Sequence, residues 1–546
     1  VSLAGSTGLT ALAVTDHDTA LGVPRALAAA EGTPLEVIPG IEVSTDYRSL
    51  ELHLVGLYID YDDPGFLAET AKITAARTDR GEAMARLLAE HGIPVTLGDV
   101  LTHAGKEDAG VITRAHFGSY LYEKGYVSSV KEAFEKYIGE GCPCYVPWKR
   151  MTPQEGVAFI RRYHGIPVMA HPLKYGMDDE ELGELIKLLK DAGLIGIEVL
   201  YGAHSQQDTA RVLALAEKYD LMPSGGSDFH GASKPGLQLG CGYGDLAVPE
   251  KILLDLKRAH YGVGAGTRIF FSDYDGTLSR TDKTISPATL EIIDKWKAAG
   301  NRFVLSSGRP LSDLFRIWKD QLGSDDIYLS GADGADIYDC AKRRIIHHCG
   351  VPLDISRRIC AMAKETGVYL HAYTDTSIVC EKDCDEIRRY TYWVPLPVVY
   401  GGENFIDTLS LPPSKLLALA FTDLEKLDTL RQKINAEFEG KVSCFFSNPS
   451  YLEIVSVHAG KGKALTWLSR HLGIDPERTV AAGDSENDIS MLRAAGTGIA
   501  MCNGIADMPA LKEAADIITE TDHDHDGLVP VLTDILARQA AEIAEI

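Results

Sequence analysis

The stretch Arg268-Ile-Phe-Phe-Ser-Asp-Tyr-Asp-Gly-Thr-Leu278 decides the fold of the second half of the chain. Its apolar run, residues 269–271, is short enough to be one buried strand, and the carboxylates Asp273 and Asp275 follow it. Ligands of a parallel α/β sheet bind beyond the carboxyl ends of the strands, so we expect both carboxylates at that edge. Two such close carboxylates repel each other unless a divalent cation compensates them. An isolated Asp-x-Asp would be interpreted as an acidic turn, but three later stretches argue against that.

These three stretches carry complementary groups in a fixed order. Residues 303–310 predict a strand that ends in hydroxyls, beginning with Ser306. Lys461 stands at the start of a predicted helix, and residues 480–488 predict a strand that ends in a carboxylate-rich loop. In phosphoryl transfer a carboxylate can attack, donors hold the phosphoryl oxygens and a lysine neutralises charge. The order acid, hydroxyl, cation, acid therefore predicts that chemistry.

With these motifs, residues 268–546 resemble a Cof-like phosphatase of the haloacid dehalogenase superfamily. The resemblance implies a Rossmann-like core with an inserted α/β cap, and Mg²⁺-dependent hydrolysis of small phosphorylated metabolites through an aspartyl-phosphate. It implies that Asp273 is the nucleophile and Asp275 the general acid and base. Ser306 and Lys461 would hold the phosphoryl group, with Lys463 as a rival for the lysine role. The other implied roles are metal binding by Asp273, the Asp275 carbonyl, Asp484 and Asp488, and substrate binding by Ser307, Gly308 and Asn487.

The first half of the chain alternates predicted strands and helices, and most of the strands bear metal-ligand types. The predicted strands are residues 9–15, 35–42, 51–58, 166–172, 194–200 and 221–230. His, Asp and Glu are ligands of zinc, manganese and iron. The candidate ligands are His17, Glu42, His53, His171, Asp228 and His230. Their positions predict a parallel α/β barrel with its site at one face.

These same residues make the first half, residues 1–264, resemble a PHP (polymerase and histidinol phosphatase) domain. The similarity is to the branch that acts on nucleoside phosphates and short RNA. It implies a distorted (β/α)7 barrel with two or three divalent metals (Mn, Zn or Fe) and hydrolysis by metal-activated water. Residues 112–117 resemble the substrate loop of that branch, where Arg114 and His116 would contact phosphate.

The PHP family begins with a strand that carries His-x-His, and the sequence as given starts after that position. We expect that the strand is missing from the sequence and has not been lost by the domain. The other candidate ligands are all present. Buried histidine and carboxylate clusters are costly without a metal, so a site that had lost its metal would be free to drift away from these residue types.

Length and composition give the organisation of the chain. Its 546 residues predict two or three domains. We expect the PHP domain at residues 1–264 and the phosphatase domain at residues 268–546, joined by a glycine-rich segment. Within the phosphatase we expect the core at residues 268–330 and 455–546 and the cap at residues 331–454.

Charge and cysteine usage limit the partners. A net charge of −24 argues against broad binding of long nucleic acid, which needs a basic face. No apolar run approaches transmembrane length, and the ten cysteines are scattered, so we expect a cytoplasmic protein with no membrane partner. The first alternative is that the PHP domain is a non-catalytic binding or regulatory module. The second is a nuclease for larger nucleic acid. The oligomeric state does not follow from the sequence.

Overall fold

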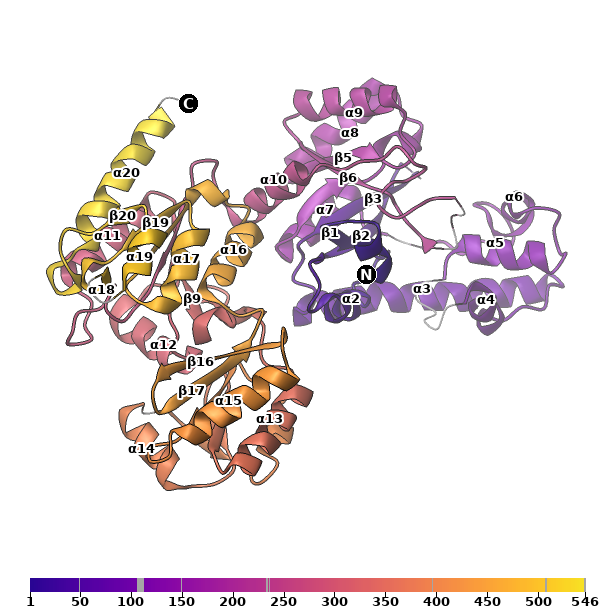
Figure 1. Ribbon diagram of the computed structural model, residues 1–546. Helices are drawn as coiled ribbons and strands as arrows, with labels where there is room; N and C mark the ends of the chain where they lie inside the picture. The colour runs from indigo at the N-terminus through magenta and orange to yellow at the C-terminus, as the bar shows by residue number, and fades with distance from the viewer. Residues whose placement is uncertain are drawn as a thin grey trace. The chain divides into compact units, whose positions relative to one another are not determined.

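The computed structural model describes residues 1–48, 50–105, 112–148, 150–231, 234, 236–394, 396–505 and 508–544. The chain divides into two compact units, Val1–His260 and Tyr261–Ile546 (Figure 1). The division lies beside the glycine-rich segment that the sequence indicates. Across the described ranges, none of the helices combines the length and the apolar character that a bilayer span needs.

The described part of the N-terminal unit is built on a six-stranded sheet in the order β1-β2-β3-β4-β5-β6, a half-barrel. The strands are β1 (Ala11–Val14), β2 (Glu36–Tyr47), β3 (Leu50–Leu57), β4 (Ile166–Met169), β5 (Gly196–Tyr201) and β6 (Met222–Gly226). Each coincides with one of the strands predicted from the sequence. The expectation of parallel strands throughout is wrong, because β3 runs antiparallel to both β2 and β4. Only residues 48 and 49 separate β2 from β3, and a parallel crossover needs a dozen or more residues.

Helices cover one face of this sheet. They are α2 (Val23–Ala30), α7 (Pro153–Arg162), α8 (Asp179–Asp191) and α9 (Gln206–Lys218). Val157 of α7, Leu185 of α8 and Val212 of α9 are fully buried against Ile41 of β2 and Ile197 of β5. This packing fixes the strands that carry the candidate ligands, which lie within β2 and β3 and just after β1, β4 and β6.

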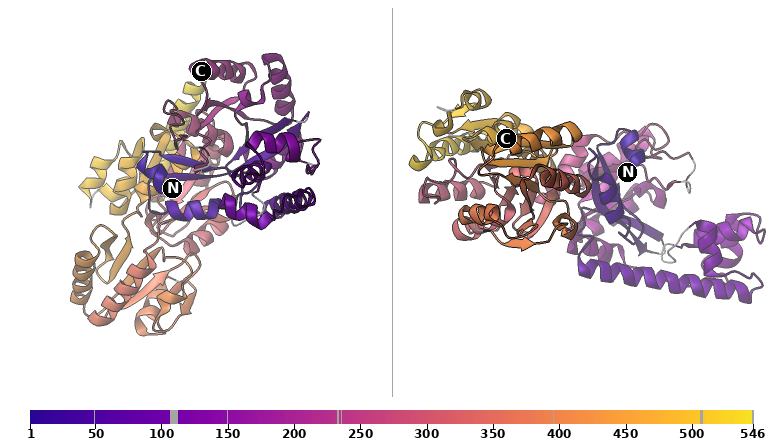
Figure 2. Two further views of the ribbon diagram at one scale, coloured as in Figure 1. Left: turned by 90° about the vertical axis from the view of Figure 1, so that its right-hand side faces the viewer. Right: turned by 60° about the horizontal axis from the view of Figure 1, so that its bottom comes forward.

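A helical lobe separates β3 from β4. It consists of α3 (Pro64–Glu90), α4 (Leu97–Ala104), α5 (Arg114–Glu123) and α6 (Val130–Ala133) (Figure 2). The 27 residues of α3 span about 40 Å at 1.5 Å per residue. Phe66 at one end of α3 belongs to the sheet core, whereas Leu88 at the other end belongs to the separate core of the lobe. One long helix therefore carries the lobe, including Arg114 and His116, on the sheet.

The C-terminal unit contains an eight-stranded core sheet in the order β11-β10-β9-β8-β7-β18-β19-β20. Its strands are β7 (Ile269–Ser272), β8 (Arg302–Ser306), β9 (Tyr328–Gly331), β10 (Asp336–Asp339), β11 (Arg344–His348), β18 (Thr479–Gly483), β19 (Thr497–Ala500) and β20 (Ile517–Ile518). Phe270 packs on one face with Trp296 of α11 (Pro287–Ala298) and Leu532 of α20 (Leu528–Ala544). Phe271 packs on the other face with α16 (Lys461–Leu472) and α17 (Ile489–Ala494). Buried on both faces, β7 delivers Asp273 to the edge of the sheet, and the predicted α/β, Rossmann-like core is confirmed.

The cap is a second sheet, in the order β14-β13-β12-β15-β17-β16, with two helices packed on one face and one on the other (Figure 1). The strands are β12 (Tyr369–Tyr373), β13 (Ile378–Cys380), β14 (Val398–Tyr400), β15 (Lys415–Leu419), β16 (Val442–Asn448) and β17 (Tyr451–Ser456), and the helices are α13 (Leu353–Thr366), α14 (Asp385–Trp393) and α15 (Glu425–Glu437). The predicted start of the cap at residue 331 needs correction. Strands β10 and β11 continue the core sheet antiparallel from β9, so the cap begins after β11.

A histidine ties β11 to the chain segment that enters β15. The Nδ1 of His348 lies 2.6 Å from Asp336 Oδ1, and its Nε2 lies 2.9 Å from the Pro412 carbonyl oxygen. Both oxygens can only accept a hydrogen bond, so the ring satisfies both only as an imidazolium. Burial alone would lower the pKa of His348, but the hydrogen bond and charge of Asp336 raise it above its ordinary value.

We predict that this tie weakens at alkaline pH. A raised folded-state pKa means that the stabilisation is complete below about 6.5, the pKa of an unperturbed histidine, and is lost as the pH rises through the folded-state value. His348→Gln should therefore increase hydrogen exchange of residues 344–351 and 412–415 at pH 6 and change it much less at pH 9, after correction for intrinsic rates. An equal effect at both pH values would contradict the imidazolium assignment.

Candidate active sites

The first site lies at the carboxyl ends of β7 and β18. Lys461, the first residue of α16, places its Nζ 2.6 Å from Asp273 Oδ1 and 2.6 Å from Asp488 Oδ1. All three side chains are buried. Lys463 is exposed and its ammonium donates to the Val457 carbonyl. The structure therefore brings Lys461, and not its rival, to Asp273.

Three carboxylates of this site lie close enough to share a cation. Asp273, Asp484 and Asp488 offer oxygen atoms within 4.8 Å of one another. Burial raises the pKa of Asp273 well above its ordinary value, although Lys461 opposes the shift. Burial and the charge of Asp488 raise the pKa of Asp484 to about 6. One lysine does not neutralise three such close carboxylates, and an all-oxygen donor set suits Mg²⁺, so these residues fit the divalent cation that the resemblance implies.

The turn after Asp275 is shaped by this carboxylate group. Gly276 has φ +79°, and a Cβ there would lie 2.3 Å from Asp484 Oδ2, so both its conformation and the close approach require glycine. Thr277 Oγ1 donates to Asp484 Oδ1 at 2.9 Å. Asn503 Nδ2 donates to the Gly276 carbonyl at 2.9 Å. Neither Thr277 nor Asn503 was predicted as a site residue, because their roles depend on contacts between distant segments.

Asp275 is held by two cations that the sequence did not single out. Arg309 donates through Nε to Oδ2 at 2.7 Å and through Nη2 to Oδ1 at 2.9 Å, and Lys283 Nζ lies 2.7 Å from Oδ1. Burial alone would raise the pKa of Asp275, but the hydrogen bonds and charge of Arg309, with those of Lys283, lower it. Arg309 follows Ser306-Ser-Gly308 directly, and this position in a predicted site loop was the signal that could have identified it.

The hydroxyl loop after β8 lies beside these carboxylates. Among the described residues, Ser306 Oγ is buried without a hydrogen-bond partner, and a phosphoryl oxygen could supply one. The Ser307 amide donates to the Ser330 carbonyl at 2.8 Å, and Ser307 Oγ accepts from the Arg309 amide at 3.2 Å. Asn487 is exposed and its Nδ2 donates to Asp333 Oδ1 at 2.9 Å. Ser306 is thus the loop group best placed to bind an added ligand.

The second site, in the N-terminal unit, is centred on Glu42. Its Oε1 lies 2.9 Å from His53 Nδ1 and 3.2 Å from His171 Nε2, and its Oε2 lies 3.5 Å from His17 Nε2. His17, Glu42 and His53 offer ligand atoms within 4.8 Å of one another. Burial alone would raise the pKa of Glu42, but hydrogen bonds from His171 and His53 lower it well below its usual range. A buried carboxylate among three imidazoles is a donor set that fits a divalent transition metal.

The other two predicted ligands have different surroundings. Asp228 Oδ2 lies 2.7 Å from Lys234 Nζ and 3.0 Å from Lys174 Nζ, and it accepts from the Tyr201 hydroxyl at 2.9 Å. His230 Nδ1 lies 3.2 Å from Asp228 Oδ1. The ring of His230 is 5.8 Å from that of His17. The structure therefore places this pair beside the Glu42 group, with the Asp228 charge already matched by lysines.

Backbone strain is concentrated in the loops that follow β1, β4 and β6. Asp18, His171 and Asp228 have φ values of 57°, 30° and 52°. The left-handed region costs non-glycine residues free energy, and such residues cluster at functional sites. Asp18 was not predicted as a ligand, and its carboxylate accepts from the Ser44 amide at 2.8 Å and pairs with Arg77.

Arginines and aromatic rings gather next to His53. Arg150 Nη2 lies 2.7 Å from Glu51 Oε2, and Glu51 Oε1 lies 3.5 Å from His53 Nε2. Trp148 packs beneath the guanidinium groups of Arg150 and Arg80, at 5.0 and 5.8 Å from the ring centre. Burial and the neighbouring charges of Arg114 and Arg150 lower the pKa of Arg80 to about 10. Like charges held this close favour a bound anion.

The two residues predicted to contact phosphate lie on α5 of the lobe. The Arg114 guanidinium lies over the rings of Tyr145 and Phe134, at 5.5 and 5.6 Å. His116 Nδ1 accepts from the Thr113 amide at 3.0 Å and so caps the helix. Arg114 therefore belongs to the arginine group, whereas one ring nitrogen of His116 is engaged in the fold.

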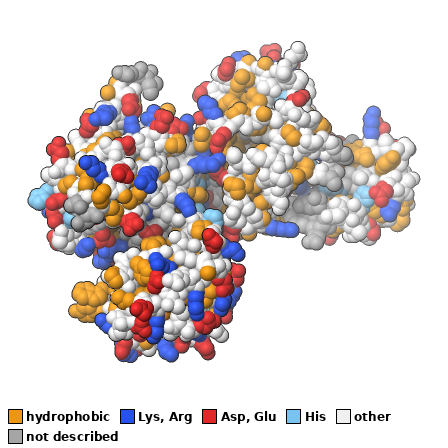
Figure 3. Space-filling model, in the orientation of Figure 1, with side chains coloured by type: hydrophobic (Ala, Val, Ile, Leu, Met, Phe, Trp, Pro, Cys, Tyr) orange, Lys and Arg blue, Asp and Glu red, His pale blue; other side chains and the backbone are white. Residues whose placement is uncertain are grey.

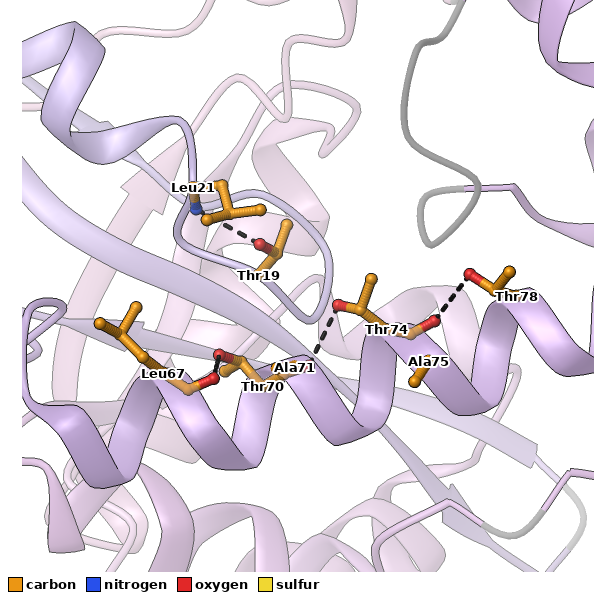
Figure 4. Close-up of a pocket in the computed structure, with 8 residues that line it drawn as sticks. All are labelled: Thr19, Leu21, Leu67, Thr70, Ala71, Thr74, Ala75 and Thr78. Atoms are coloured by element: carbon orange, nitrogen blue, oxygen red, sulfur yellow. Dashed lines mark hydrogen bonds between the residues drawn. The ribbon is translucent and has the colours of Figure 1, made fainter.

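A groove between the β1–α2 loop and α3 has a volume of about 280 Å³ (Figure 4). It is lined by Thr19, Leu21, Leu67, Thr70, Ala71, Thr74, Ala75 and Thr78. The hydroxyls of Thr70, Thr74 and Thr78 donate to carbonyls one turn earlier in α3. The groove therefore presents mainly methyl groups and includes no predicted site residue.

The two halves of the chain are similar to different families of known proteins. The model of the haloacid dehalogenase-like hydrolases matches residues 270–532. Pyridoxal phosphate phosphatase YbhA of Escherichia coli (strain K12) is 28% identical over 259 residues, 46% of this chain and 93% of that protein. The other half is similar to 5'-3' exoribonuclease Rnm of Escherichia coli (strain K12), which is 34% identical over 221 residues, 40% of this chain and 74% of that protein. It is also similar to 3',5'-nucleoside bisphosphate phosphatase of Chromobacterium violaceum, 33% identical over 229 residues, 42% of this chain and 80% of that protein.

Proposed function

We propose that this chain, which belongs to the PHP-type phosphoesterases in its first half and to the haloacid dehalogenase-like hydrolases in its second, hydrolyses phosphoric esters at two sites. One observation carries the proposal. Each unit builds its own close group of buried and partly buried metal-ligand side chains, Asp273, Asp484 and Asp488 in one and His17, Glu42 and His53 in the other.

At the C-terminal site we propose that Asp273 attacks the phosphorus atom of a small phosphorylated metabolite, a sugar phosphate or a nucleotide. Lys461, in contact with Asp273, would neutralise the phosphoryl charge, and the Ser306 hydroxyl would donate to a phosphoryl oxygen. Asp275 would protonate the leaving oxygen and later take a proton from water. Mg²⁺ held by Asp273, the Asp275 carbonyl, Asp484 and Asp488 would add charge stabilisation when bound. Asn487 and Gly308 lie around this site as candidate substrate contacts.

At the N-terminal site we propose hydrolysis of nucleotide phosphates or short oligonucleotides. Glu42, His17, His53 and His171, with Asp228 and His230, would hold two or three divalent metals (Mn, Zn or Fe), which lower the pKa of water when bound. The adjacent arginines would bind substrate phosphates. The exoribonuclease and bisphosphate phosphatase relatives support this substrate class.

The net negative charge of the chain favours short substrates over long nucleic acid. The net charge of the chain is −24, and on the face shown in Figure 3 basic side chains are interspersed with acidic ones. Long nucleic acid binds through many phosphate contacts along a basic surface. The arginine group near His53 would serve one or two phosphates.

One observation favours the alternative that the first half only binds its ligand. Lys174 and Lys234 already match the charge of Asp228, which weakens its case as a metal ligand. In that alternative the N-terminal domain would bind a nucleotide through its arginines without cleaving it. The C-terminal site would then be the only catalytic site.

Two readouts on the full chain test the proposal: release of phosphate from the monoesters and bisphosphates, and release of mononucleotides from the RNA. The substrates would be sugar phosphates, nucleoside 5'-monophosphates, 3',5'-nucleoside bisphosphates and 5'-phosphorylated short RNA, each with Mg²⁺, Mn²⁺ or Zn²⁺ and with EDTA. We expect metal-dependent turnover of one or more phosphomonoesters and of a bisphosphate or RNA substrate. Tight bisphosphate binding without turnover under every metal would support the binding-module alternative. No turnover of any substrate would reject both activities.

A further inference from the structure

A buried lysine of the cap reaches the hydroxyl loop of the core. Lys415 is the first residue of β15, and its Nζ donates to the Gly308 carbonyl oxygen at 3.0 Å. Its side chain is 6% exposed. Gly308 lies in the loop that begins with Ser306 at the end of β8. A single ammonium group therefore links the cap sheet to the loop that we propose binds the phosphoryl group.

The cap itself holds this ammonium group in place. Glu453 of β17 lies 3.0 Å from Lys415 Nζ through Oε2, and the Tyr373 ring centre lies 5.1 Å from it. Burying such an ion pair costs desolvation, and replacement by apolar residues is often neutral or stabilising. The pair is therefore weak as an explanation of stability alone, and its contact with Gly308 gives it a different role.

The orientation of the Gly308 carbonyl affects the positions of the residues that follow it in the loop. Its peptide continues into the Arg309 amide, which donates to Ser307 Oγ at 3.2 Å, and the Arg309 side chain holds Asp275. From a second direction Asp333 packs against Gly308, because a Cβ at Gly308 would lie 3.0 Å from Asp333 Oδ1. Fixing the Gly308 carbonyl therefore fixes the peptide that sets Arg309 and, through it, Asp275.

We propose that Lys415 is a positioning residue that couples seating of the cap to the geometry of the 306–309 loop, with Glu453 holding its ammonium group. This inference rests on the phosphatase function proposed for the C-terminal site. When the cap packs on the core, the Lys415 ammonium group reaches the Gly308 carbonyl. When the cap lacks that ammonium group, the 306–309 loop is less ordered. The effect should appear in the chemical step and not in substrate affinity, since Lys415 acts through the loop.

Lys415→Met in the full chain, which keeps the length of the side chain and removes its charge, tests the coupling. Misplacement of reacting groups by small distances costs up to about 100-fold in rate, so we expect kcat to fall roughly 10–100-fold with KM changed less than about threefold. The same factor should hold for p-nitrophenyl phosphate and for any larger phosphomonoester. Glu453→Gln should lower kcat less, about 3–10-fold, because the ammonium group remains. Lys382→Met, at an exposed lysine of the cap, is the matched control and should change nothing.

Hydrogen exchange gives a second readout that does not need turnover. We expect Lys415→Met to increase exchange of residues 305–310 while residues 269–272 in β7 keep their protection. A rise in KM that differs between substrates would overturn the proposal in favour of direct substrate contact. Unchanged kcat and unchanged loop exchange would also overturn it. If Lys415→Met does not fold, the same two measurements on Glu453→Gln decide. Absence of phosphatase activity in the wild type would reject the proposed function, whereas the exchange result would still decide the coupling.

Discussion

Asp273→Asn is expected to abolish phosphoester hydrolysis at the C-terminal site and to leave the N-terminal site active. The new amide keeps the shape of the side chain but is a poor nucleophile. Removal of a covalent nucleophile costs on the order of 10⁴-fold or more in kcat. The fold should persist, because the amide oxygen can still accept the hydrogen bond that Lys461 now donates to Asp273 at 2.6 Å.

The same variant should separate catalytic loss from unfolding. Three carboxylates lie together here, and burial already raises the pKa of Asp273. Removing one negative charge should therefore leave the metal-free protein equally or more resistant to heat, while the stabilisation gained from added Mg²⁺ shrinks. Thermal unfolding with and without Mg²⁺ measures both effects. Asp294→Asn, at an exposed aspartate of α11, is the control.

Full phosphomonoesterase activity in purified Asp273→Asn would remove Asp273 from the nucleophile role. The role also requires that wild-type protein form a trifluoroberyllate adduct in the presence of Mg²⁺, as an analogue of the aspartyl-phosphate. An adduct on the variant would be equally incompatible with it.

The elements and the ligand types were predictable because they are local. Most of the apolar runs that became β1–β6, β7, β8 and β18 contain Asp, Glu, His or Ser or are followed closely by one, so the sequence shows which strands carry these groups. Both family resemblances inferred from them are confirmed. The direction of β3 and the extension of the core sheet by β10 and β11 were missed. Strand direction depends on turn length and on pairing partners, which the apolar pattern of one strand does not encode.

The partners that tune each site were not predictable from local patterns. Asp275 and Arg309 are 34 residues apart, and Glu42 and His171 are 129 apart. Arg80, Trp148 and Arg150 meet only because the helical lobe folds back beside His53. An arginine in a helix has the same local pattern whether it faces solvent or an anion. Only the structure distinguishes the two, and it adds Arg309, Arg80 and Arg150 to the residues worth testing.

Glu42→Gln is expected to reduce metal content and activity of the N-terminal unit more than any other single change there. Glu42 contacts His17, His53 and His171. A carboxylate can bridge two cations, whereas a neutral imidazole cannot, so Glu42 is the sensible central ligand. The amide has one acceptor oxygen and presents an N–H₂ group to its neighbours. Even residues that only support metal ligands cost about 10–100-fold in affinity or activity when changed, so a central ligand should cost at least about 100-fold.

Two measurements on the full chain check this. Elemental analysis of dialysed protein should show less Mn, Zn or Fe per chain in the variant, and hydrolysis of bisphosphate or short RNA should fall with it. Turnover of phosphomonoesters at the C-terminal site should stay unchanged and serves as an internal standard. Glu31→Gln, at an exposed glutamate of the same unit, is the control variant. Metal content and bisphosphate hydrolysis equal to wild type would refute Glu42 as the central ligand. Loss of both activities together would show that Glu42→Gln acts on folding and not on one metal site, because the two groups of ligands come from separate units of the chain.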